Sequence, residues 1–159
     1  MHRGAAPEDG EPLDGALDGG PEGGARQAFC SFESAVIRVV PRVERGERIN
    51  VGVVVFCREH DFLGLRLEPD EGRLLALAPD LDLEAVRHHL AFLEAVAAGE
   101  ACGGAVAQLP KVERFGWMVS PTSTIVQPSR PHTGLCTAPA QALERLLDRL
   151  VRVKISRPG

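Results

Sequence analysis

The stretch Ile49–Phe56, INVGVVVF, decides the fold. Apart from Asn50 and Gly52 it consists of β-branched or aromatic apolar residues, which is typical of a strand covered on both faces of a sheet. An amide and a glycine weaken such a strand unless the amide is hydrogen-bonded and the glycine admits a close neighbour. We therefore expect a central strand here. For Asn50 we favour a structural bond from the strand to an adjoining turn over a ligand-facing amide.

Two further strands flank this one in the sequence. ESAVIRVV, Glu33–Val40, is rich in β-branched residues and is stopped by Pro41. FLGLRLE, Phe62–Glu68, alternates leucine with glycine or a charged residue, as a strand with one exposed face does. The short connection REHD predicts a hairpin between the second and third strands. The sequence therefore predicts a three-stranded antiparallel meander at the start of the domain.

The apolar period changes further along the chain. After Asp82, a typical N-cap, apolar residues recur at helical spacing until Gly99. A last amphipathic helix begins near Pro139. Between them, KVERFGWMV fits a helix or a strand, and STIVQ, Ser123–Gln127, predicts a short strand. The predicted fold class is α+β, an antiparallel sheet made of the meander and the short later strand, with two main helices packed on one face.

Composition divides the chain into a leader, a domain and a tail. Residues 1–27 are rich in glycine and proline and carry six acidic residues against two arginines, which predicts a disordered acidic leader. Residues 28–155 form the expected single domain, and residues 156–159 form a tail. The leader accounts for the net charge of -4, so the remainder carries 16 basic and 16 acidic residues. A neutral domain makes general nucleic-acid binding an unfavoured function.

No apolar run has the roughly 20 residues that a membrane span needs, and no signal peptide is recognisable, so we expect a cytoplasmic protein. Arginine far outnumbers lysine, a bias typical of GC-rich bacterial genomes. The four cysteines form no CxxC pair, and only Cys57 and His60 have the spacing of zinc ligands. We therefore expect no metal and no cofactor, and we interpret Cys57 and Cys102 as small buried hydrophobic residues.

Four arginines lie within eleven residues at the first turn, together with several glutamates: Arg38, Arg42, Arg45 and Arg48, with Glu33, Glu44 and Glu47. Arginines converging there could hold a phosphate or carboxylate through paired hydrogen bonds. The alternative is a surface turn in which the glutamates satisfy the arginines. Arg38 is the exception, because it interrupts an apolar strand and must be paired or serve a site.

The stretch Ser120–Cys136, SPTSTIVQPSRPHTGLC, is broken by three prolines, which predicts a constrained polar loop. If the protein is an enzyme, His132 is the candidate acid or base, and Ser123 or Thr133 is its nucleophile or assisting group. Ser120, Gln127 and the backbone at Gly134 could instead bind an anion or a partner. The G-x-S-x-G motif of serine hydrolases is absent. We expect a binding surface rather than a reaction centre.

Trp117 is the only tryptophan in a chain without tyrosine, and it directly precedes this loop. Such a residue is usually part of the core, but with Arg114 and Phe115 it could form one wall of a pocket. A single aromatic residue cannot form a base-stacking platform, which argues against an RNA-recognition sheet.

The segments RVVPRVERGERINVGVVVFC and SPTSTIVQPSRPHTG give the chain a specific resemblance. It resembles the bacterial family called domain of unknown function 3037 (DUF3037) over about Ser34–Arg152. The family pattern maps onto Arg38, Pro41, Glu47, Asn50, Val51, Gly52, Phe56, Arg114, Phe115, Trp117, Ser120, Ser123, Gln127, His132 and Gly134. The resemblance implies no activity or cofactor. It does imply a partner, because members are often encoded beside a HipA-like kinase.

Three functions are therefore open from the sequence. The favoured one is a non-catalytic interaction or regulatory module that binds a protein partner, a HipA-like kinase, through the first turn and the Ser120–Gly134 loop. The alternative is a phosphate- or nucleotide-handling enzyme in which Arg38 and Arg45 hold the anion of the substrate. It requires the turn and the loop to meet in space. The third is nucleic-acid binding through the arginines alone.

Overall fold

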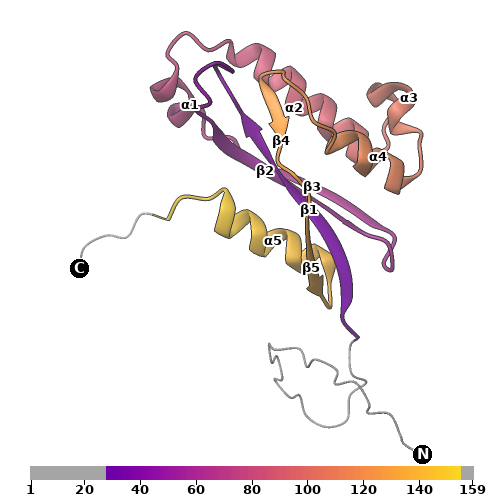
Figure 1. The fold of residues 1–159 in the computed structure, drawn as a ribbon. Coiled ribbons are helices and arrows are strands. Elements are labelled where there is room, and N and C mark those ends of the chain that lie inside the picture. Colours follow the sequence, from indigo (N-terminus) through magenta and orange to yellow (C-terminus); the bar gives the residue numbers. More distant parts are fainter. Residues whose placement is uncertain (1–27, 155–159) are drawn as a thin grey trace, which may run out of the picture.

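A five-stranded antiparallel sheet forms the centre of the protein (Figure 1). The structure is a computed structural model and describes residues 28–154. The leader expected over residues 1–27 and the tail expected over residues 156–159 lie outside the described residues. The strand order is β3-β2-β1-β4, and β5 also pairs with β1. The predicted α+β class is confirmed.

The predicted meander is present as β1 (Cys30–Val39), β2 (Ile49–Cys57) and β3 (Phe62–Leu67). β2 lies between the other two, and all but one of its residues are buried. The pairing of β1 with β2 steps from Ile37–Gly52 to Arg38–Asn50, which leaves Val51 as the extra residue of a bulge. A Cβ atom on Gly52 would stand 2.6 Å from the Arg66 carbonyl oxygen of β3, so glycine is needed for this close approach.

The outer edge of β1 is covered by two short strands from the far end of the chain. β4 (Val126–Pro128) pairs with Ile37–Val39, and β5 (His132–Cys136) pairs with Cys30–Ser34. Ser129 joins the two, because its hydroxyl accepts from the Val36 amide at 2.9 Å and its own amide donates to the Val36 carbonyl at 2.8 Å. The strand expected at Ser123–Gln127 is thus present but shifted, while β5 replaces part of the expected loop.

Helices fill the middle and the end of the chain. α2 (Leu83–Ala98) begins at the predicted cap, where the Asp82 carboxylate accepts from the Ala85 amide, and it ends at left-handed Gly99. α5 (Pro139–Leu150) is the predicted last helix. The ambiguous KVERFGWMV segment is helix α4 (Lys111–Met118). Three short elements were not predicted: α1 (Glu71–Leu77), the 3-10 turn η1 (Ala101–Gly103) and α3 (Gly104–Ala107). In the described part of the chain, no single helix is long and apolar enough to cross a membrane.

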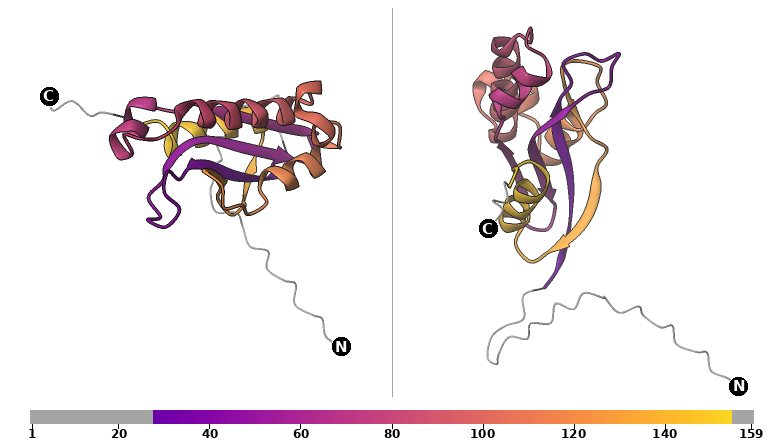
Figure 2. Two further views of the ribbon diagram at one scale, coloured as in Figure 1. Left: turned by 90° about the horizontal axis from the view of Figure 1, so that it is seen from above. Right: turned by 90° about the vertical axis from the view of Figure 1, so that its left-hand side faces the viewer.

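The expectation that both main helices pack on one face of the sheet was wrong. Figure 1 shows α2, α3 and α4 on one side of the strands and α5 on the other, and α2 runs alongside the strands for much of their length (Figure 2). On β2, Val54 and Phe56 pack into the core beneath α2, whereas Val53 and Val55 pack against α5. The apolar stripe of a helix indicates which helix face is buried, but it does not indicate which sheet face it covers.

Candidate functional site

The turn between β1 and β2, residues 41–48, is called the arginine turn below, and its charges are largely paired. The Arg45 Nε donates to Glu47 at 2.6 Å, and the Arg42 guanidinium contacts both carboxylate oxygens of Asp80 at 3.1 and 3.2 Å. The Arg45 guanidinium holds the pKa of the Glu47 carboxyl below its ordinary value. These ion pairs are exposed. The turn therefore fits the locally satisfied surface turn better than an arginine cluster that converges on an anion.

Arg38 differs from the arginines of the arginine turn because one of its side-chain nitrogens is buried without a partner. It lies on β1 opposite Asn50 on one side and Gln127 on the other. Within residues 28–154, its Nε is the one buried side-chain nitrogen or oxygen without a hydrogen-bond partner. Burial, together with the positive charge of Arg48, lowers the pKa of its guanidinium. Arg38 thus carries an uncompensated charge that a bound anion would stabilise.

Asn50 has the kind of structural bond that we favoured for it. Its Nδ2 donates to the carbonyl oxygen of Leu150 at 3.0 Å, so it fastens β2 to the last turn of α5 rather than to a turn. A hollow of about 680 Å³ adjoins it. Charged residues of that hollow pair with one another, as Glu68 does with Arg152 through bonds of 2.6 and 2.9 Å.

The polar stretch Ser120–Cys136 is not one loop, because it contains the strands β4 and β5. Its first part lies beside the arginine turn, because the Val40 amide donates to the Ile125 carbonyl at 2.7 Å. Several of its side chains are bonded to nearby backbone: the Ser120 hydroxyl donates to the Gly116 carbonyl, and the Gln127 amide donates to the Thr124 carbonyl. These groups satisfy their own loop and helix end. Among the polar side chains of residues 120–127, Ser123 is exposed and makes no hydrogen bond within the described residues.

The last part of this stretch is strand rather than the expected loop. His132, Thr133 and Gly134 lie on β5 opposite Ser34, Glu33 and Phe32 of β1. Gly134 is required there, since a Cβ atom would stand 2.6 Å from the Phe32 ring. His132 is exposed, and its partner Ser34 lies four residues before Arg38, about 13 Å along a strand. The structure does not bring His132 and Arg38 together as an assembled catalytic pair.

Arg114 is not a wall of a pocket. Its side chain is buried, and its guanidinium donates to the carbonyl oxygens of Leu109, Val96 and Ala97 at 2.9, 3.0 and 2.8 Å. Val96 and Ala97 belong to the last turn of α2, whose carbonyl groups have no partner within the helix. Arg114 therefore closes the end of α2 and fixes α4 against it.

Trp117 is partly exposed on α4 and contacts Phe92, a residue that was not among the predicted site residues. Its ring meets Phe92 of α2 edge to face, with centroids 5.8 Å apart, and the two side chains are 40% and 38% exposed. Beside them is a mainly apolar hollow of about 630 Å³, lined by His88, His89, Ala91, Phe92, Ala95 and Cys102. We call Trp117 and these lining residues the aromatic patch. The signal for it was present, because Phe92 falls outside the buried stripe of its helix.

The other three cysteines meet beneath the opposite sheet face. The Sγ atom of Cys30 lies 3.4 Å from that of Cys57 and 3.8 Å from that of Cys136. Burial raises the pKa of the Cys30 thiol to about 12 and also raises that of Cys136. Cys57 is buried as predicted, whereas the prediction for Cys102 was wrong, because that thiol is exposed in the η1 turn.

A family model described as protein of unknown function (DUF3037) matches residues 34–151. The chain belongs to the DUF3037 family. In this DUF3037 protein the matched span runs from within β1 to just past α5 and includes Arg38, Asn50, Arg114, Trp117 and His132. None of the curated proteins and none of the solved structures matches the chain significantly.

Five candidate residues of the DUF3037 protein thus fall into two groups. Asn50, Arg114 and Ser120 bond to helix ends and hold the fold together. Arg38 has an unpartnered buried nitrogen, and Trp117 is 40% exposed. The residues of the second group are the candidates for binding. Arg38 lacks a hydrogen-bond partner, and Trp117 leaves part of an apolar side chain in water.

Proposed function

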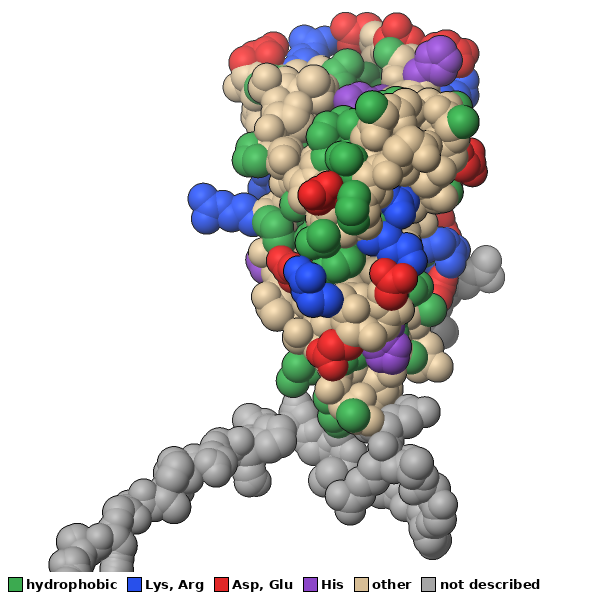
Figure 3. All heavy atoms as spheres, turned by 90° about the vertical axis from the view of Figure 1, so that its right-hand side faces the viewer, with side chains coloured by type: hydrophobic (Ala, Val, Ile, Leu, Met, Phe, Trp, Pro, Cys, Tyr) green, Lys and Arg blue, Asp and Glu red, His purple; other side chains and the backbone are tan. Residues whose placement is uncertain are grey.

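We propose that this DUF3037 protein is a non-catalytic interaction module that binds a protein partner in the bacterial cytoplasm through the aromatic patch. The observation that carries the proposal is the exposed edge-to-face pair of Phe92 and Trp117 beside an apolar hollow. Figure 3 looks onto the side that carries α3 and α4, where hydrophobic side chains gather between scattered charged ones.

The energetics of the pair support binding. Aromatic side chains bury about 150–250 Å² each, so covering the exposed two fifths of both removes roughly 170 Å² from water, equivalent to about 4 kcal/mol. Tryptophan is also among the residues that most often dominate interface energetics. The neighbouring hollow would admit an apolar side chain of the partner.

The proposed partner is a HipA-like kinase, which the gene neighbourhood of DUF3037 members implies. The proposed contact surface differs from the one expected from sequence. The arginine turn and the start of the Ser120–Gly134 stretch share one end of the sheet, but His132 and Gly134 lie further along β1. Trp117 is a binding candidate from the sequence, and α2 and Cys102 of η1 supply the rest of the aromatic patch.

Affinity measurements with the purified kinase test this proposal. Trp117→Ala should weaken binding about 30-fold, equivalent to about 2 kcal/mol, and Phe92→Ala should weaken it about tenfold. Leu135→Ala is the matched control, because this leucine is 65% exposed on β5, away from the aromatic patch. The proposal is abandoned if the kinase neither associates with the protein nor changes its activity, or if all three variants bind equally.

A second candidate function, a phosphate- or nucleotide-handling role, rests on the unpartnered Nε of Arg38. A ligand that binds only the folded state raises the melting temperature. Phosphate or a nucleotide should therefore stabilise the parent protein and the Arg42→Met control but not Arg38→Met. Equal responses in both variants would remove this candidate. Nucleic-acid binding by the arginine turn is not favoured, because Arg42 and Arg45 are already paired with carboxylates.

A further inference from the structure

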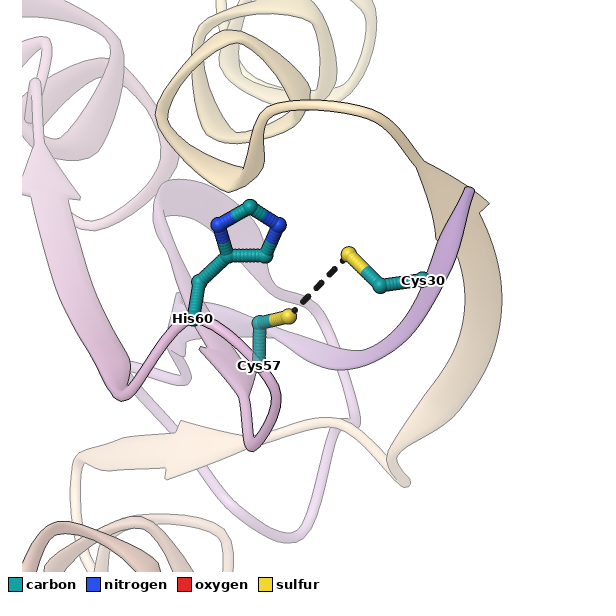
Figure 4. A group of neighbouring side chains, drawn as sticks. All are labelled: Cys30, Cys57 and His60. Atoms are coloured by element: carbon teal, nitrogen blue, oxygen red, sulfur yellow. Dashed lines mark hydrogen bonds between the residues drawn. The ribbon is translucent and has the colours of Figure 1, made fainter. Parts of the chain in front are cut away.

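Cys30, Cys57 and His60 place three metal-binding atoms together at the end of the β2–β3 hairpin. The two sulfur atoms and a ring nitrogen of His60 all lie within 4.8 Å of one another. Figure 4 shows the imidazole turned toward the two sulfur atoms. The Sγ atom of Cys136 adds a fourth donor, 3.8 Å from that of Cys30.

We propose that Cys30, Cys57, His60 and Cys136 bind one divalent transition-metal ion, and that zinc is the ion this set favours. Three thiolates and one imidazole form one of the ligand sets of structural zinc sites, and thiolate ligands select zinc over magnesium or calcium. The proposal departs from the sequence-based expectation that the protein has no metal site.

The sulfur spacing fits tetrahedral coordination. Zinc–sulfur bonds are about 2.3 Å long, which places two sulfur ligands of a tetrahedron about 3.8 Å apart. The two sulfur–sulfur distances from Cys30 are 3.8 Å and 3.4 Å. The Cys30–Cys136 distance equals that spacing, and the Cys30–Cys57 distance is 0.4 Å shorter (3.8 Å against 3.4 Å).

Each ligand is positioned by a different part of the fold. Cys30 and Cys136 are directly paired residues of β1 and β5, and Cys57 is the last residue of β2. His60 lies in the tight turn that follows, where the Asp61 amide donates to the Arg58 carbonyl at 3.1 Å. An ion bound there would link β1 to both of its neighbours, β2 and β5, and to the turn of the β2–β3 hairpin.

Burial and charge are also compatible with an ion. The three thiols are at most 4% exposed, whereas His60 is exposed, so the histidine side offers a route for entry. Three thiolates and a divalent ion leave one negative charge, and Arg145 of α5 places a positive charge near Cys136. Simple apolar packing of the thiols would not account for the imidazole at the open side.

Cobalt titration of the full-length protein, reduced with a phosphine, tests the proposal. One equivalent of Co²⁺ should give the visible absorption of a tetrahedral site together with thiolate-to-cobalt charge transfer, and Zn²⁺ should displace it. His60→Ala should weaken the affinity at least tenfold. This variant is expected to fold, because His60 is exposed and its loss leaves no cavity. Cys57→Ser should abolish the charge transfer.

Matched controls come from the same residue types elsewhere in the chain. Cys102→Ser and His132→Ala remove an exposed thiol and an exposed imidazole, and both should bind cobalt as the parent does. A reduced parent protein without charge transfer would overturn the proposal. Undiminished cobalt binding in both His60→Ala and Cys57→Ser would also overturn it. The same holds if Cys30 and Cys57 form a disulfide and the protein still binds no metal after that disulfide is reduced.

Discussion

Replacing Arg114 with methionine should lower the free energy of unfolding by about 3–5 kcal/mol, because this side chain closes the end of α2 from within the core. The guanidinium makes three bonds of 2.8–3.0 Å to carbonyl oxygens, and the residue is 8% exposed. Methionine preserves most of the packing of the aliphatic stem while removing the donors.

The magnitude follows from the number and type of these bonds. A hydrogen bond to a charged group contributes about 1.5–3 kcal/mol, so three sum to roughly 5–9 kcal/mol. Water can reach part of the freed carbonyl groups, which reduces this sum toward the 3–5 kcal/mol typical of breaking a buried charged contact. Native proteins are stable by only about 5–15 kcal/mol, so the loss would be a large share of the total.

Urea unfolding followed by the fluorescence of Trp117, on the same helix, measures the effect. For an m-value of about 2 kcal/mol/M, the midpoint should fall by about 2 M with the slope unchanged. Arg114→Lys keeps a charge but fewer donors and should lose less. Arg149→Met, an exposed change in α5, should stay within about 0.5 kcal/mol of the parent. A loss at Arg114→Met no larger than that of this control would refute the reasoning.

Three further substitutions test other parts of the fold. Gly52→Ala should lower the free energy of unfolding by about 1–3 kcal/mol, since its Cβ would stand 2.6 Å from a backbone carbonyl oxygen of β3. A Cβ at Gly116 would face open space, so Gly116→Ala should not destabilise the protein. Thermal unfolding of the two variants measures the difference. Asn50→Ala should cost about 1 kcal/mol by freeing the last carbonyl of α5, as measured in urea, and an unchanged midpoint would contradict this. Arg152 lowers the pKa of Glu68 below its ordinary value of 4.5. The stabilisation by Glu68 should therefore be present above about pH 4.5 and disappear as pH falls through the lowered pKa. Glu68→Gln should remove at most about 1 kcal/mol at neutral pH and nothing in acid; a difference that grows in acid would have the wrong sign.

The regular elements were predictable where one pattern alone specifies them. The β-branched content of β1 and β2 reflects burial on both faces of the sheet. The alternation in β3 and the helical spacing in α2 and α5 reflect burial on one face of each element. β5 has no such pattern. It contains one glycine and directly follows Pro131, and it is a strand because β1 offers an unpaired edge. α1 is too short for its apolar spacing to stand out.

The candidate sites were harder to predict, because their character depends on contacts between distant residues. Arg114 and Asn50 are residue types that often bind ligands, yet both bond to the ends of helices. These helix ends lie far from them in the sequence, so the contacts could not be predicted. Arg38 could be singled out correctly as an exception, because a charge within an apolar strand conflicts with its own surroundings. The meeting of Cys30 with Cys57 and Cys136 needed the strand register, which one sequence does not supply.

The pairing of β1 has a consequence for synthesis of the protein on the ribosome. One edge of β1 pairs with β2, the next strand in the sequence. The other edge pairs with β5, where Cys136 lies 106 residues after its partner Cys30. At about 5–20 residues per second, the roughly 80 residues after Cys57 take about 4–16 s to translate. During that time the nascent chain presents an apolar, unpaired strand edge to chaperones and to other nascent chains. Ribosome-stalled chains should accordingly become protease-resistant only once Cys136 has emerged.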